Sequence, residues 1–318
     1  FLLSVPALAK NFRKNIESLI RAKGRFTERL FNFALRTAYV YNRDGYSKGH
    51  GWRIVLWPLV KLFDAALFRK VREAFGGSLR FFVGGGALLD AELQRFYYAI
   101  GIPMFQGYGL SEATPVISTN SPRPRKCRFG SSGTLVQPLD CRILDEEGRE
   151  VPLGQRGQIV VRGENVMAGY WKNPEATADT VRDGWLHTGD MATMDPDGTL
   201  YIRGRSKTMI LSGNGQNIYP EEIEDKLNNM YLVLESLVLD AGNGKIKALV
   251  VPDYEQAEAE GVDKADLPQI MQNNLQELNA QLAAYERISG IALYPNEFEK
   301  TPKRSIKRYL YEPSLLNK

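Results

Sequence analysis

Apolar residues recur at helical spacing through the first eighty positions of the chain. Ile16, Leu19 and Ile20 form one such set, with polar residues between and around them. Because side chains three and four positions apart share one face of an α-helix, this pattern predicts a helical stretch that buries one face. Gly76-Gly77 ends the pattern, since paired glycines disfavour the continuation of a helix.

Strand and helix signals then alternate. Leu79 to Val83 is an apolar run typical of a buried strand, and the three glycines at 84–86 predict a turn after it. A helix is expected from about Asp90 to Ala99, and IPMFQGYGLSE predicts a second short strand that runs into another glycine turn. Strand, turn and helix in succession predict a doubly wound α/β layer, whose ligands gather at the carboxyl ends of the strands.

From about Lys126 to Arg205 the chain changes to short alternating segments separated by Gly and Pro. CRILDEEGREVPLGQRGQIVVRG is the clearest of these segments, with DEEG predicted as a turn between two strands. The pattern predicts a small β-rich subdomain.

Residues beyond Gly204 predict a third region that mixes helices and strands. YPEEIEDKLNNM is expected to be a helix with Pro220 in its first turn, where proline removes no helical hydrogen bond. LESLVLD and KIKALVVPD predict two strands joined by a tight Asn-Gly turn. A second helix is expected after Asp266, which is predicted to cap it, with an apolar face of Met271, Leu275, Leu278, Leu282 and Tyr285.

These patterns together predict an α/β chain with a partial doubly wound N-terminal layer, a small β-rich subdomain and a separate α+β C-terminal domain. The expected boundaries are residues 1–125, 126–205 and 206–318. A chain of 318 residues with 43% hydrophobic content is long enough and apolar enough to build several cores.

The net charge of +4 is unevenly distributed along the chain. From Lys10 to Glu73 there are fifteen Lys and Arg against five Asp and Glu, interleaved with aromatic residues, so the remainder of the chain is net negative. One interpretation is a set of amphipathic helices with a solvated basic face. The alternative is attraction of this stretch to an anionic membrane surface or an acidic ligand.

Cysteine usage and terminal patterns indicate the compartment. Cys127 and Cys141 have no C-x-x-C pairing, so neither a zinc site nor a disulfide framework is predicted, and a reducing cytoplasm is expected. The longest apolar run, Ile54 to Val60, is far shorter than the ~20 residues of a membrane span. In FLLSVPALAKNFRKN the charges follow the apolar run, unlike a secretory signal. Without an initial Met, the chain is expected to begin inside a longer protein.

GYGLSEA, residues 107–113, carries groups suited to a nucleotide. Tyr108 could stack on a base, Ser111 could bind a phosphate oxygen, and Glu112 could hold Mg²⁺ through oxygen coordination. The segment is not a G-x-S-x-G nucleophile elbow, and no G-x-x-x-x-G-K-[ST] phosphate loop occurs in the chain. The glycines at 84–86 leave the backbone open to a planar ring or a phosphate, which alone is a weak signal.

Two further stretches fit the same chemistry. In DGWLHTGD, Asp190 follows a glycine and could accept two hydrogen bonds from a ribose diol, although a type I turn capped by an Asp is the simpler alternative. In GRSKTMILSGNGQNIYPEEIE, Arg205 is a candidate for a nucleotide phosphate or ribose. Lys207 lies at the boundary where a hinge is expected.

KTPKRSIKR, from Lys300 to Arg308, places five cations among nine residues near the end of the chain. A run of this kind is compatible with a nucleic-acid patch, a membrane-surface patch, or a mobile loop that presents cations to a phosphate.

Taken in order, GYGLSEA, GENVMAGYWKNPEAT (163–177), DGWLHTGD and GRSKTMILSGNGQNIYPEEIE resemble four successive motifs of the adenylate-forming superfamily. That superfamily contains acyl-CoA synthetases, peptide-synthetase adenylation domains and firefly luciferase. The resemblance runs from about Leu79 to the C-terminus. The basic aromatic stretch before LRFFVGGGALL and the ending TPKRSIKRYLY are most similar to bacterial long-chain fatty acid–CoA ligases.

The resemblance implies a two-step reaction. ATP and a fatty acid give an acyl-adenylate and pyrophosphate, and the thiol of coenzyme A then attacks the mixed anhydride after the C-terminal domain has swung as a mobile lid. ATP, Mg²⁺ and coenzyme A are therefore the implied cofactors and co-substrates. A hydrolysis-prone intermediate requires a site that excludes water, which accounts for a lid.

The resemblance also implies roles by position. The implied nucleotide site comprises Gly84, Gly85, Gly86, Tyr108, Gly109, Ser111, Asp190 and Arg205. Glu112 would bind Mg²⁺ and Lys207 would be the hinge, while Gly213 and Gly215 would line the channel for the pantetheine arm of coenzyme A.

Two departures from the family pattern stand out. The Thr/Ser/Gly-rich loop followed by Lys, which cradles the β- and γ-phosphates, is absent from these 318 residues; it is expected upstream of Phe1, so this fragment alone is expected to be inactive. The pattern K-T-x-x-G-K-x-x-R places the adenylation lysine on Ser305, which cannot supply a cation to the transferred phosphate. Either Arg304 or Lys307 substitutes for it, or the first step is impaired.

The resulting prediction is a cytoplasmic AMP-forming acyl-CoA synthetase for long-chain fatty acids, with peripheral membrane attachment through residues 10–73 as an open possibility. A catalytically weak member that binds nucleotide or acyl-CoA as a partner or regulator is the alternative. Nucleic-acid binding is not expected, because no recognition module is present.

Overall fold

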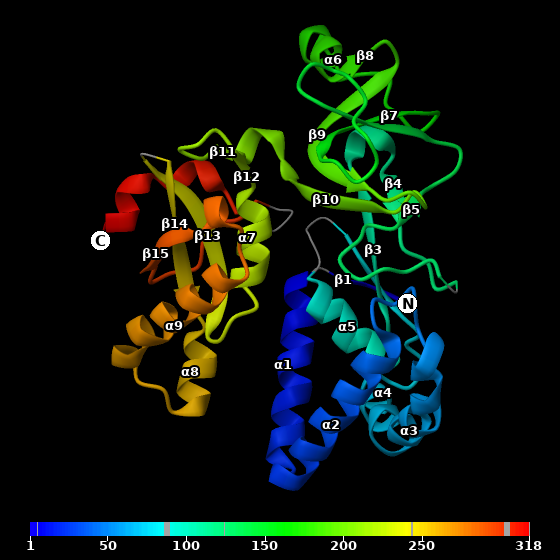
Figure 1. Ribbon diagram of the computed structural model, residues 1–318, viewed down its shortest axis with the longest axis vertical. Coiled ribbons are helices and arrows are strands. Elements are labelled where there is room, and N and C mark those ends of the chain that lie inside the picture. Colours follow the sequence, from blue (N-terminus) through cyan, green and yellow to red (C-terminus); the bar gives the residue numbers. More distant parts are fainter. Residues whose placement is uncertain (5, 86–89, 124, 243, 302–305, 318) are drawn as a thin grey trace. The chain divides into compact units, whose positions relative to one another are not determined.

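The structure is a computed structural model, and it describes residues 1–4, 6–85, 90–123, 125–242, 244–301 and 306–317 (Figure 1). The chain forms two compact units. Unit 1 comprises Phe1–Thr188 and Ala192–Ile202, and unit 2 comprises Gly189–Met191 and Arg203–Lys318. The predicted α/β class is confirmed, whereas the expected boundaries after residues 125 and 205 stay predictions.

The helical region at the start of the chain is confirmed. It consists of α1 (Pro6–Ala22), α2 (Arg25–Asn42), a 3-10 segment η1 (Gly51–Leu56), α3 (Trp57–Phe63), a π-helical turn η2 (Asp64–Phe68) and α4 (Arg69–Ala74). The helices pack around a core in which Phe31, Phe68, Phe82, Phe96 and Tyr97 are at most 1% exposed. Each large apolar side chain buried in this way stabilises the fold by about 1.5–3 kcal/mol.

A five-stranded sheet adjoins these helices in unit 1. Its order is β1 (Leu2–Ser4), β2 (Phe82–Gly84), β3 (Met104–Gly109), β4 (Val116–Thr119) and β5 (Thr134–Leu135). β1, β2 and β3 are parallel, and β4 and β5 continue the sheet antiparallel. α5 (Ala91–Ala99) connects β2 to β3, as predicted, and the Asp90 side chain caps it by accepting the Glu92 and Leu93 amides.

The glycines of this sheet do not lie where the sequence pattern predicted them. The strand expected over 79–83 is Phe82–Gly84, so Gly84 belongs to the strand and pairs with Ser4 on one side and Gln106 on the other. Gly107 and Gly109 likewise lie in β3 and pair with β4. The positions predicted for Gly84, Gly107 and Gly109 in turns were wrong, because a strand can contain glycine as readily as a turn does, while Gly86 lies outside the described residues.

A second sheet has the order β10-β9-β7-β6, with β8 (Val181–Arg182) paired to β9. It is built from β6 (Asp140–Leu144), β7 (Gly157–Arg162), β9 (Trp185–Met194) and β10 (Leu200–Arg205), and α6 (Pro174–Thr180) precedes β8. The DEEG turn is confirmed by the bond from the Gly148 amide to the Asp145 carbonyl. These strands form the β-rich part that the sequence predicts.

Unit 2 is an α+β layer. β11 (Ile210–Leu211) and β12 (Asn217–Ile218) form a small hairpin, and β13 (Val233–Gly242), β14 (Lys245–Pro252) and β15 (Ile288–Leu293) form a mixed sheet. Its helices are α7 (Pro220–Leu227), α8 (Tyr254–Glu260) and α9 (Leu267–Ala280). Pro220 begins α7 as predicted, while Asn243 of the predicted tight turn lies outside the described residues.

The start and end of α9 differ from the prediction. Asp266 makes no side-chain cap, because its backbone is already helical; the Asp263 side chain caps the preceding 3-10 turn by accepting the Ala265 amide. α9 ends at Ala280, and Tyr285 lies in a later 3-10 turn instead of on the helix. Met271, Leu275 and Leu278 are buried as expected.

Among the described residues, no helix has both the length and the apolar character needed to cross a membrane.

Candidate functional site

A cavity of about 410 Å³ lies at the carboxyl ends of the three parallel strands of unit 1. Ser4, Gly84 and Gln106 are in register across β1, β2 and β3, and the chain beyond this row forms the cavity wall. Its lining residues are Leu3, Ser4, Val83, Gly84, Gly85, Gly107, Tyr108, Gly109, Pro115 and Val116. The structure thus brings together four of the residues predicted to bind a nucleotide, while Gly86 lies outside the described residues.

The close approach of a neighbouring backbone segment explains why position 109 is a glycine. A Cβ atom built on Gly109 would overlap the carbonyl oxygen of Pro115, because β3 and the segment before β4 run side by side at this point. A Cβ on Gly85 would meet its nearest atom, the Gly107 carbonyl oxygen, at 3.8 Å, which is an ordinary contact. Gly109 is therefore required by packing, whereas Gly85 leaves open space on the wall of the cavity.

The motif residues after Gly109 lie in a short 3-10 turn, η3 (Ser111–Ala113). Ser111 is exposed, and Glu112 is half-buried. The Glu112 Oε1 atom accepts a hydrogen bond from the Tyr170 hydroxyl at 2.9 Å. Tyr108 is half-buried, lines the cavity and packs against the core of the β-rich part.

The segment 163–177 supports this turn, a role that the sequence did not reveal. The Met167 amide donates to the Glu112 carbonyl at 2.8 Å, and the Asn165 side-chain amide donates to the Ala113 carbonyl at 2.9 Å. Burial, followed by the hydrogen bond with Glu112, raises the pKa of the Tyr170 hydroxyl. Both stretches contain polar side chains, but nothing in their spacing along the sequence showed that they pair.

The metal-binding potential of the site rests on one carboxylate. Within the described part of the chain, no three His, Cys, Asp or Glu side chains form a cluster that could hold a metal ion. Glu112 uses one oxygen for Tyr170. Since Mg²⁺ is commonly bound by one or two carboxylates together with substrate phosphates, Glu112 fits this ion as a partner of a nucleotide.

Asp190 and Arg205 meet in unit 2. Arg205 Nε donates to Asp190 Oδ1 at 2.7 Å, and the Asp190 side chain is only 10% exposed whereas that of Arg205 is 61% exposed. The type I turn considered for this stretch is wrong, because residues 188–190 lie within β9, with Gly189 at φ 70°. The two predicted ribose partners are therefore adjacent, and the arginine extends from a buried carboxylate toward solvent.

The predicted hinge lies next in the chain. Lys207 is exposed in the 3-10 turn η4 (Ser206–Thr208), and the Thr208 hydroxyl donates to Glu221 of α7 at 2.6 Å. Gly213 and Gly215 lie in the loop between β11 and β12, where the Gln216 amide donates to the Ser212 hydroxyl at 2.8 Å. Their predicted contact with coenzyme A stays a prediction.

The basic run near the C-terminus is held at both ends. Pro302, Lys303, Arg304 and Ser305 lie outside the described residues. On one side Lys300 Nζ lies 2.7 Å from a Glu235 oxygen, and a β-bridge joins Lys300 to Ile306. On the other side Lys307 Nζ lies 3.2 Å from a Glu299 oxygen. Lys307 therefore already has a carboxylate partner, and its substitution for the missing lysine stays a prediction.

Arg308 is the most strongly anchored of the described cations in this run. Its Nη1 and Nη2 atoms lie 2.8 and 2.6 Å from Glu224 Oε1, which also accepts the Val238 amide at 2.6 Å. Burial raises the pKa of the Glu224 carboxyl to about 7, against the lowering effects of Arg308 and the Val238 amide. The sequence contained Glu224 in the PEEIE stretch, but its partner lies 84 positions away.

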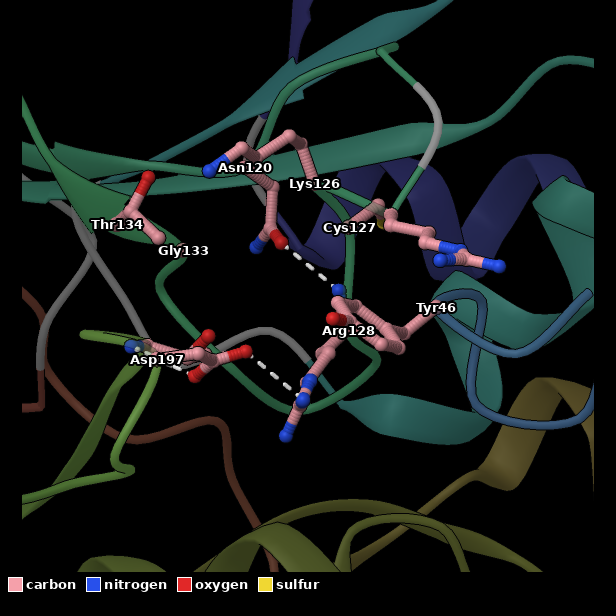
Figure 2. Close-up of a pocket in the computed structure, with 10 residues that line it drawn as sticks. Tyr46, Asn120, Lys126, Cys127, Arg128, Gly133, Thr134 and Asp197 are labelled. Atoms are coloured by element: carbon pink, nitrogen blue, oxygen red, sulfur yellow. Dashed lines mark hydrogen bonds and ion pairs between the residues drawn. The ribbon is translucent and has the colours of Figure 1, made fainter.

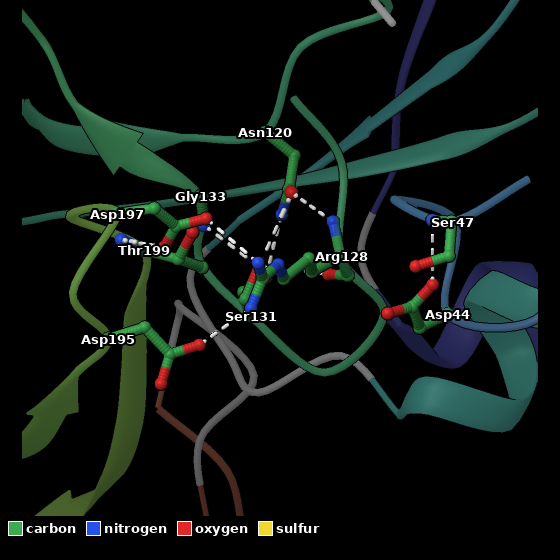
Figure 3. Close-up of polar contacts among 9 residues, drawn as sticks. All are labelled: Asp44, Ser47, Asn120, Arg128, Ser131, Gly133, Asp195, Asp197 and Thr199. Carbon is green, nitrogen blue, oxygen red and sulfur yellow. Dashed lines mark hydrogen bonds and ion pairs between the residues drawn. The ribbon is translucent and has the colours of Figure 1, made fainter. Parts of the chain in front are cut away.

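A second, smaller cavity of about 70 Å³ in unit 1 is lined by charged residues (Figure 2). Arg128 Nη1 lies 2.7 Å from Asp195 and its Nη2 lies 2.8 Å from Asp197, while its guanidinium lies 4.3 Å from the centre of the Tyr46 ring. The Arg128 amide donates to Asn120 Oδ1 at 3.0 Å (Figure 3). The arginine is thus used to join three segments, which indicates a structural role.

Replacing Arg128 by alanine is expected to lower the unfolding free energy of unit 1 by about 1–2 kcal/mol. Both ion pairs are partly exposed, so their contribution to the unfolding free energy lies between that of a surface ion pair and that of a buried one. Burial alone would raise the pKa of Asp197, but the Thr199 hydrogen bonds and the Arg128 charge lower it. Urea unfolding followed by Trp fluorescence measures the change, and an unchanged midpoint would contradict the structural role.

Comparison with known sequences and structures shows which protein family has these features. The AMP-binding enzyme family model matches residues 25–171, and the model for the AMP-binding enzyme C-terminal domain matches residues 207–314. The structure is similar to an anthranilate CoA ligase solved with anthranoyl-AMP, with a TM-score of 0.63 and 29% identity over 75% of this chain and 44% of that one. The chain therefore belongs to the adenylate-forming superfamily of AMP-binding enzymes.

Within that superfamily it belongs with the acyl-CoA ligases. It is 33% identical over 257 residues to a long-chain-fatty-acid–CoA ligase of Mycobacterium tuberculosis, covering 81% of this chain and 40% of that protein. It is 44% identical over 167 residues to a long-chain-fatty-acid–CoA ligase of Yersinia pestis, covering 52% of this chain and 29% of that protein. A feruloyl-CoA synthase of an Amycolatopsis species is 43% identical over 185 residues, covering 57% and 38%. The chain spans well under half the length of these relatives.

Proposed function

We propose that this chain forms the adenylate-binding wall and the C-terminal domain of an AMP-forming acyl-CoA synthetase. The observation that carries the proposal is the cavity at the carboxyl ends of β1, β2 and β3, whose wall includes exposed backbone at Gly85 and Gly109 beside the ring of Tyr108. Bare backbone next to an aromatic ring suits a flat purine, and the carboxyl ends of parallel strands are where α/β layers bind ligands.

The proposed reaction has two steps. A fatty acid carboxylate attacks the α-phosphate of ATP, giving the acyl-adenylate and releasing pyrophosphate. The coenzyme A thiolate then attacks the acyl carbon, the thioester C–S bond forms, and AMP leaves as the C–O bond to phosphate breaks. Ser111 is assigned to a phosphate oxygen, and Asp190 with Arg205 to the ribose hydroxyls. Glu112 is assigned to Mg²⁺, which would neutralise phosphate charge when bound.

A long-chain fatty acid is the acyl substrate that we propose. Two observations support this choice: the apolar residues Leu3, Val83, Pro115 and Val116 on the cavity wall, and the similarity to long-chain ligases over most of this chain. The similarity to a feruloyl-CoA synthase and to an anthranilate CoA ligase makes an aromatic acid the competing substrate class.

Calorimetric titration of the 318-residue chain tests separately whether the site binds a nucleotide and which acyl group it prefers. AMP is titrated first, followed by non-hydrolysable acyl-sulfamoyl adenosines that carry palmitoyl, feruloyl or acetyl groups. Tighter binding of the palmitoyl compound supports the long-chain assignment, and tighter binding of the feruloyl compound replaces it with an aromatic acid. Failure to bind AMP and every analogue would overturn the nucleotide site itself.

The same 318 residues are expected to show no fatty-acid-dependent exchange of pyrophosphate into ATP. These residues contain no Thr/Ser/Gly-rich loop with a following Lys to hold the β- and γ-phosphates, and Ser305 occupies the position of the adenylation lysine. The measurement is the incorporation of labelled pyrophosphate into ATP with palmitate present, using a complete acyl-CoA synthetase as positive control. Robust exchange would show that other cations in this chain replace both features.

A second candidate function is that of a nucleotide- or acyl-CoA-binding partner with weak catalysis. It is supported by Ser305 and by the ion pair that joins Lys307 to Glu299, since both reduce the cations available to an attacked phosphate. Adding preformed palmitoyl-adenylate and coenzyme A distinguishes the two functions. Formation of the thioester favours the synthetase, and tight binding without turnover favours the partner.

A further inference from the structure

A further cavity of unit 1 lies at the opposite end of β3 from the proposed nucleotide cavity. It has a volume of about 550 Å³, which is within the range of small-molecule sites. Pro103 and Phe105, at the start of β3, form part of its wall, whereas the proposed nucleotide cavity is lined by the end of the same strand. We name this cavity the cationic pocket, after the side chains of Lys48, Arg123 and Arg125 that line it.

The charged side chains that line the cationic pocket are all basic. Lys48 comes from the segment after α2, and Arg123 and Arg125 come from the loop between β4 and β5. Its described lining residues include no Asp or Glu, and none of the three basic side chains forms an ion pair with a residue that the structure describes. Cations that share a pocket without a carboxylate repel one another, so an anion bound among them would be stabilised.

Aromatic rings form the wall beside these cations. Lys48 Nζ lies 5.0 Å from the centre of the Tyr98 ring and 5.9 Å from the centre of the Tyr41 ring. The Phe105 side chain is a further aromatic member of the wall. Because a cation–π contact is weaker than a charge-assisted hydrogen bond, Lys48 remains available to an anion. The pocket thus offers rings and cations side by side.

Backbone contacts hold the two segments of the cationic pocket together. The Ser121 amide donates to the Lys126 carbonyl at 2.9 Å and closes the loop that carries the two arginines. The Phe129 amide donates to the Asp44 carbonyl at 3.0 Å, which joins the end of this loop to the segment after α2. A Cβ atom on Gly45 would lie 2.9 Å from the Phe129 ring, so the two segments are in close contact there. A pocket that is already formed loses less conformational entropy when it binds a ligand.

We propose that the cationic pocket binds a diphosphate group that is attached to a flat aromatic body, as in a nucleoside diphosphate. A diphosphate carries several negative charges, which matches three cations without a neighbouring carboxylate. Guanidinium groups bind phosphate oxygens through paired hydrogen bonds, and a base can stack on an aromatic side chain. A ligand with a single carboxylate would leave most of the positive charge in the pocket uncompensated. This site is independent of the proposed ligase function.

Calorimetric titration of the 318-residue chain with ADP tests the proposal. The chain is first mixed with excess palmitoyl-sulfamoyl adenosine, so that the proposed nucleotide cavity is occupied. We expect ADP to bind, with an affinity that falls about tenfold or more in Arg123→Gln/Arg125→Gln and about fivefold in Lys48→Gln. The three side chains are exposed, so these variants are expected to keep their fold, which far-UV circular dichroism checks. Pyrophosphate is expected to bind about tenfold more weakly than ADP, because it cannot stack on the rings.

Lys126→Gln is the matched control. Lys126 is exposed, belongs to the same loop and carries the same charge as Lys48, but it does not line the cationic pocket. Loss of ADP binding in the double variant, with full binding in Lys126→Gln, supports the proposal. Failure of ADP to bind the unaltered chain, unchanged binding in the double variant, or an equal loss in Lys126→Gln would overturn it.

Two further readouts separate the parts of this proposal. Pyrophosphate binding as tight as that of ADP would overturn the role of the aromatic wall in favour of free diphosphate. Titration of palmitoyl-sulfamoyl adenosine into the same variants shows whether the proposed nucleotide cavity is intact. If this analogue fails to bind while ADP binds and depends on Arg123 and Arg125, the nucleotide cavity is overturned and the cationic pocket is supported.

Discussion

Replacing Arg308 by alanine is expected to lower the unfolding free energy of unit 2 by about 3–5 kcal/mol at pH 8.5. The Glu224 carboxylate is 12% exposed and receives two contacts from Arg308 and one from the Val238 amide. Removing the guanidinium leaves a nearly buried carboxylate with one hydrogen bond and no opposite charge. That penalty exceeds the value of the contact itself, because the unpaired charge has lost its water.

The cost of this substitution is expected to depend on pH. Burial raises the pKa of Glu224 from 4.5 to about 7, so the native unit holds this proton more tightly than the unfolded chain. The contribution of this group to the stability of the unaltered protein is therefore complete below about pH 4.5 and declines as the pH rises to about 7. Without Arg308 the pKa rises further and the decline continues above pH 7. The variant should thus lose more stability at pH 8.5 than at pH 6.

The chain offers a way to observe unit 2 separately. All four tryptophans, Trp52, Trp57, Trp171 and Trp185, lie in unit 1. Urea unfolding followed by circular dichroism reports both units, whereas Trp fluorescence reports unit 1, so a shift seen only by circular dichroism belongs to unit 2. Lys307→Ala is the neighbouring control, because its exposed ion pair with Glu299 is worth at most about 1 kcal/mol. Equal effects of the two substitutions would contradict the special role of Arg308.

Replacing Gly109 by alanine is expected to weaken AMP binding by roughly tenfold or more and to lower the stability of unit 1 by about 3 kcal/mol. The added methyl group would occupy the position of the Pro115 carbonyl oxygen, which belongs to the backbone and cannot rotate away. β3 and the start of β4 would have to separate, and both provide walls of the cavity.

Gly85→Ala separates the effect on the cavity from the effect on the fold. Its methyl group would lie 3.8 Å from the nearest atom, so the stability of unit 1 is expected to stay within about 0.5 kcal/mol of the unaltered value. AMP affinity is measured by calorimetry, and stability by urea unfolding with Trp fluorescence. Normal AMP binding by Gly109→Ala would show that the nucleotide does not use this wall.

Local chemistry explains which elements could be predicted. The helix Ala91–Ala99 follows a capping Asp90, and the helix Pro220–Leu227 begins at a proline. Both signals act within one turn of the backbone and need no distant partner. The four motifs that led to the adenylate-forming family could be predicted for the same reason, because each is a continuous stretch of sequence.

Other predictions failed where distant residues decide the conformation. Glycines at 84, 107 and 109 were expected in turns, but they pair with neighbouring strands inside β2 and β3, and only at Gly109 does a neighbouring segment leave no room for a side chain. A glycine in a sequence indicates space or an unusual backbone angle without saying which one is needed. The capping of the helix near 266 was wrong for a related reason, since Asp263 and Asp266 are both suitable caps until the backbone conformation is known.

The sequence by itself determined the order of the elements, the α/β class and the family, because periodicity, caps and continuous motifs are local properties of the chain. Only the tertiary structure decided that the glycines form one cavity wall at the ends of three strands, and that segment 163–177 supports the turn at Glu112. It also decided that Arg308 is bound to a carboxylate 84 positions away. These features depend on distances between segments that are remote in sequence, and such distances are set by the packing of the whole unit.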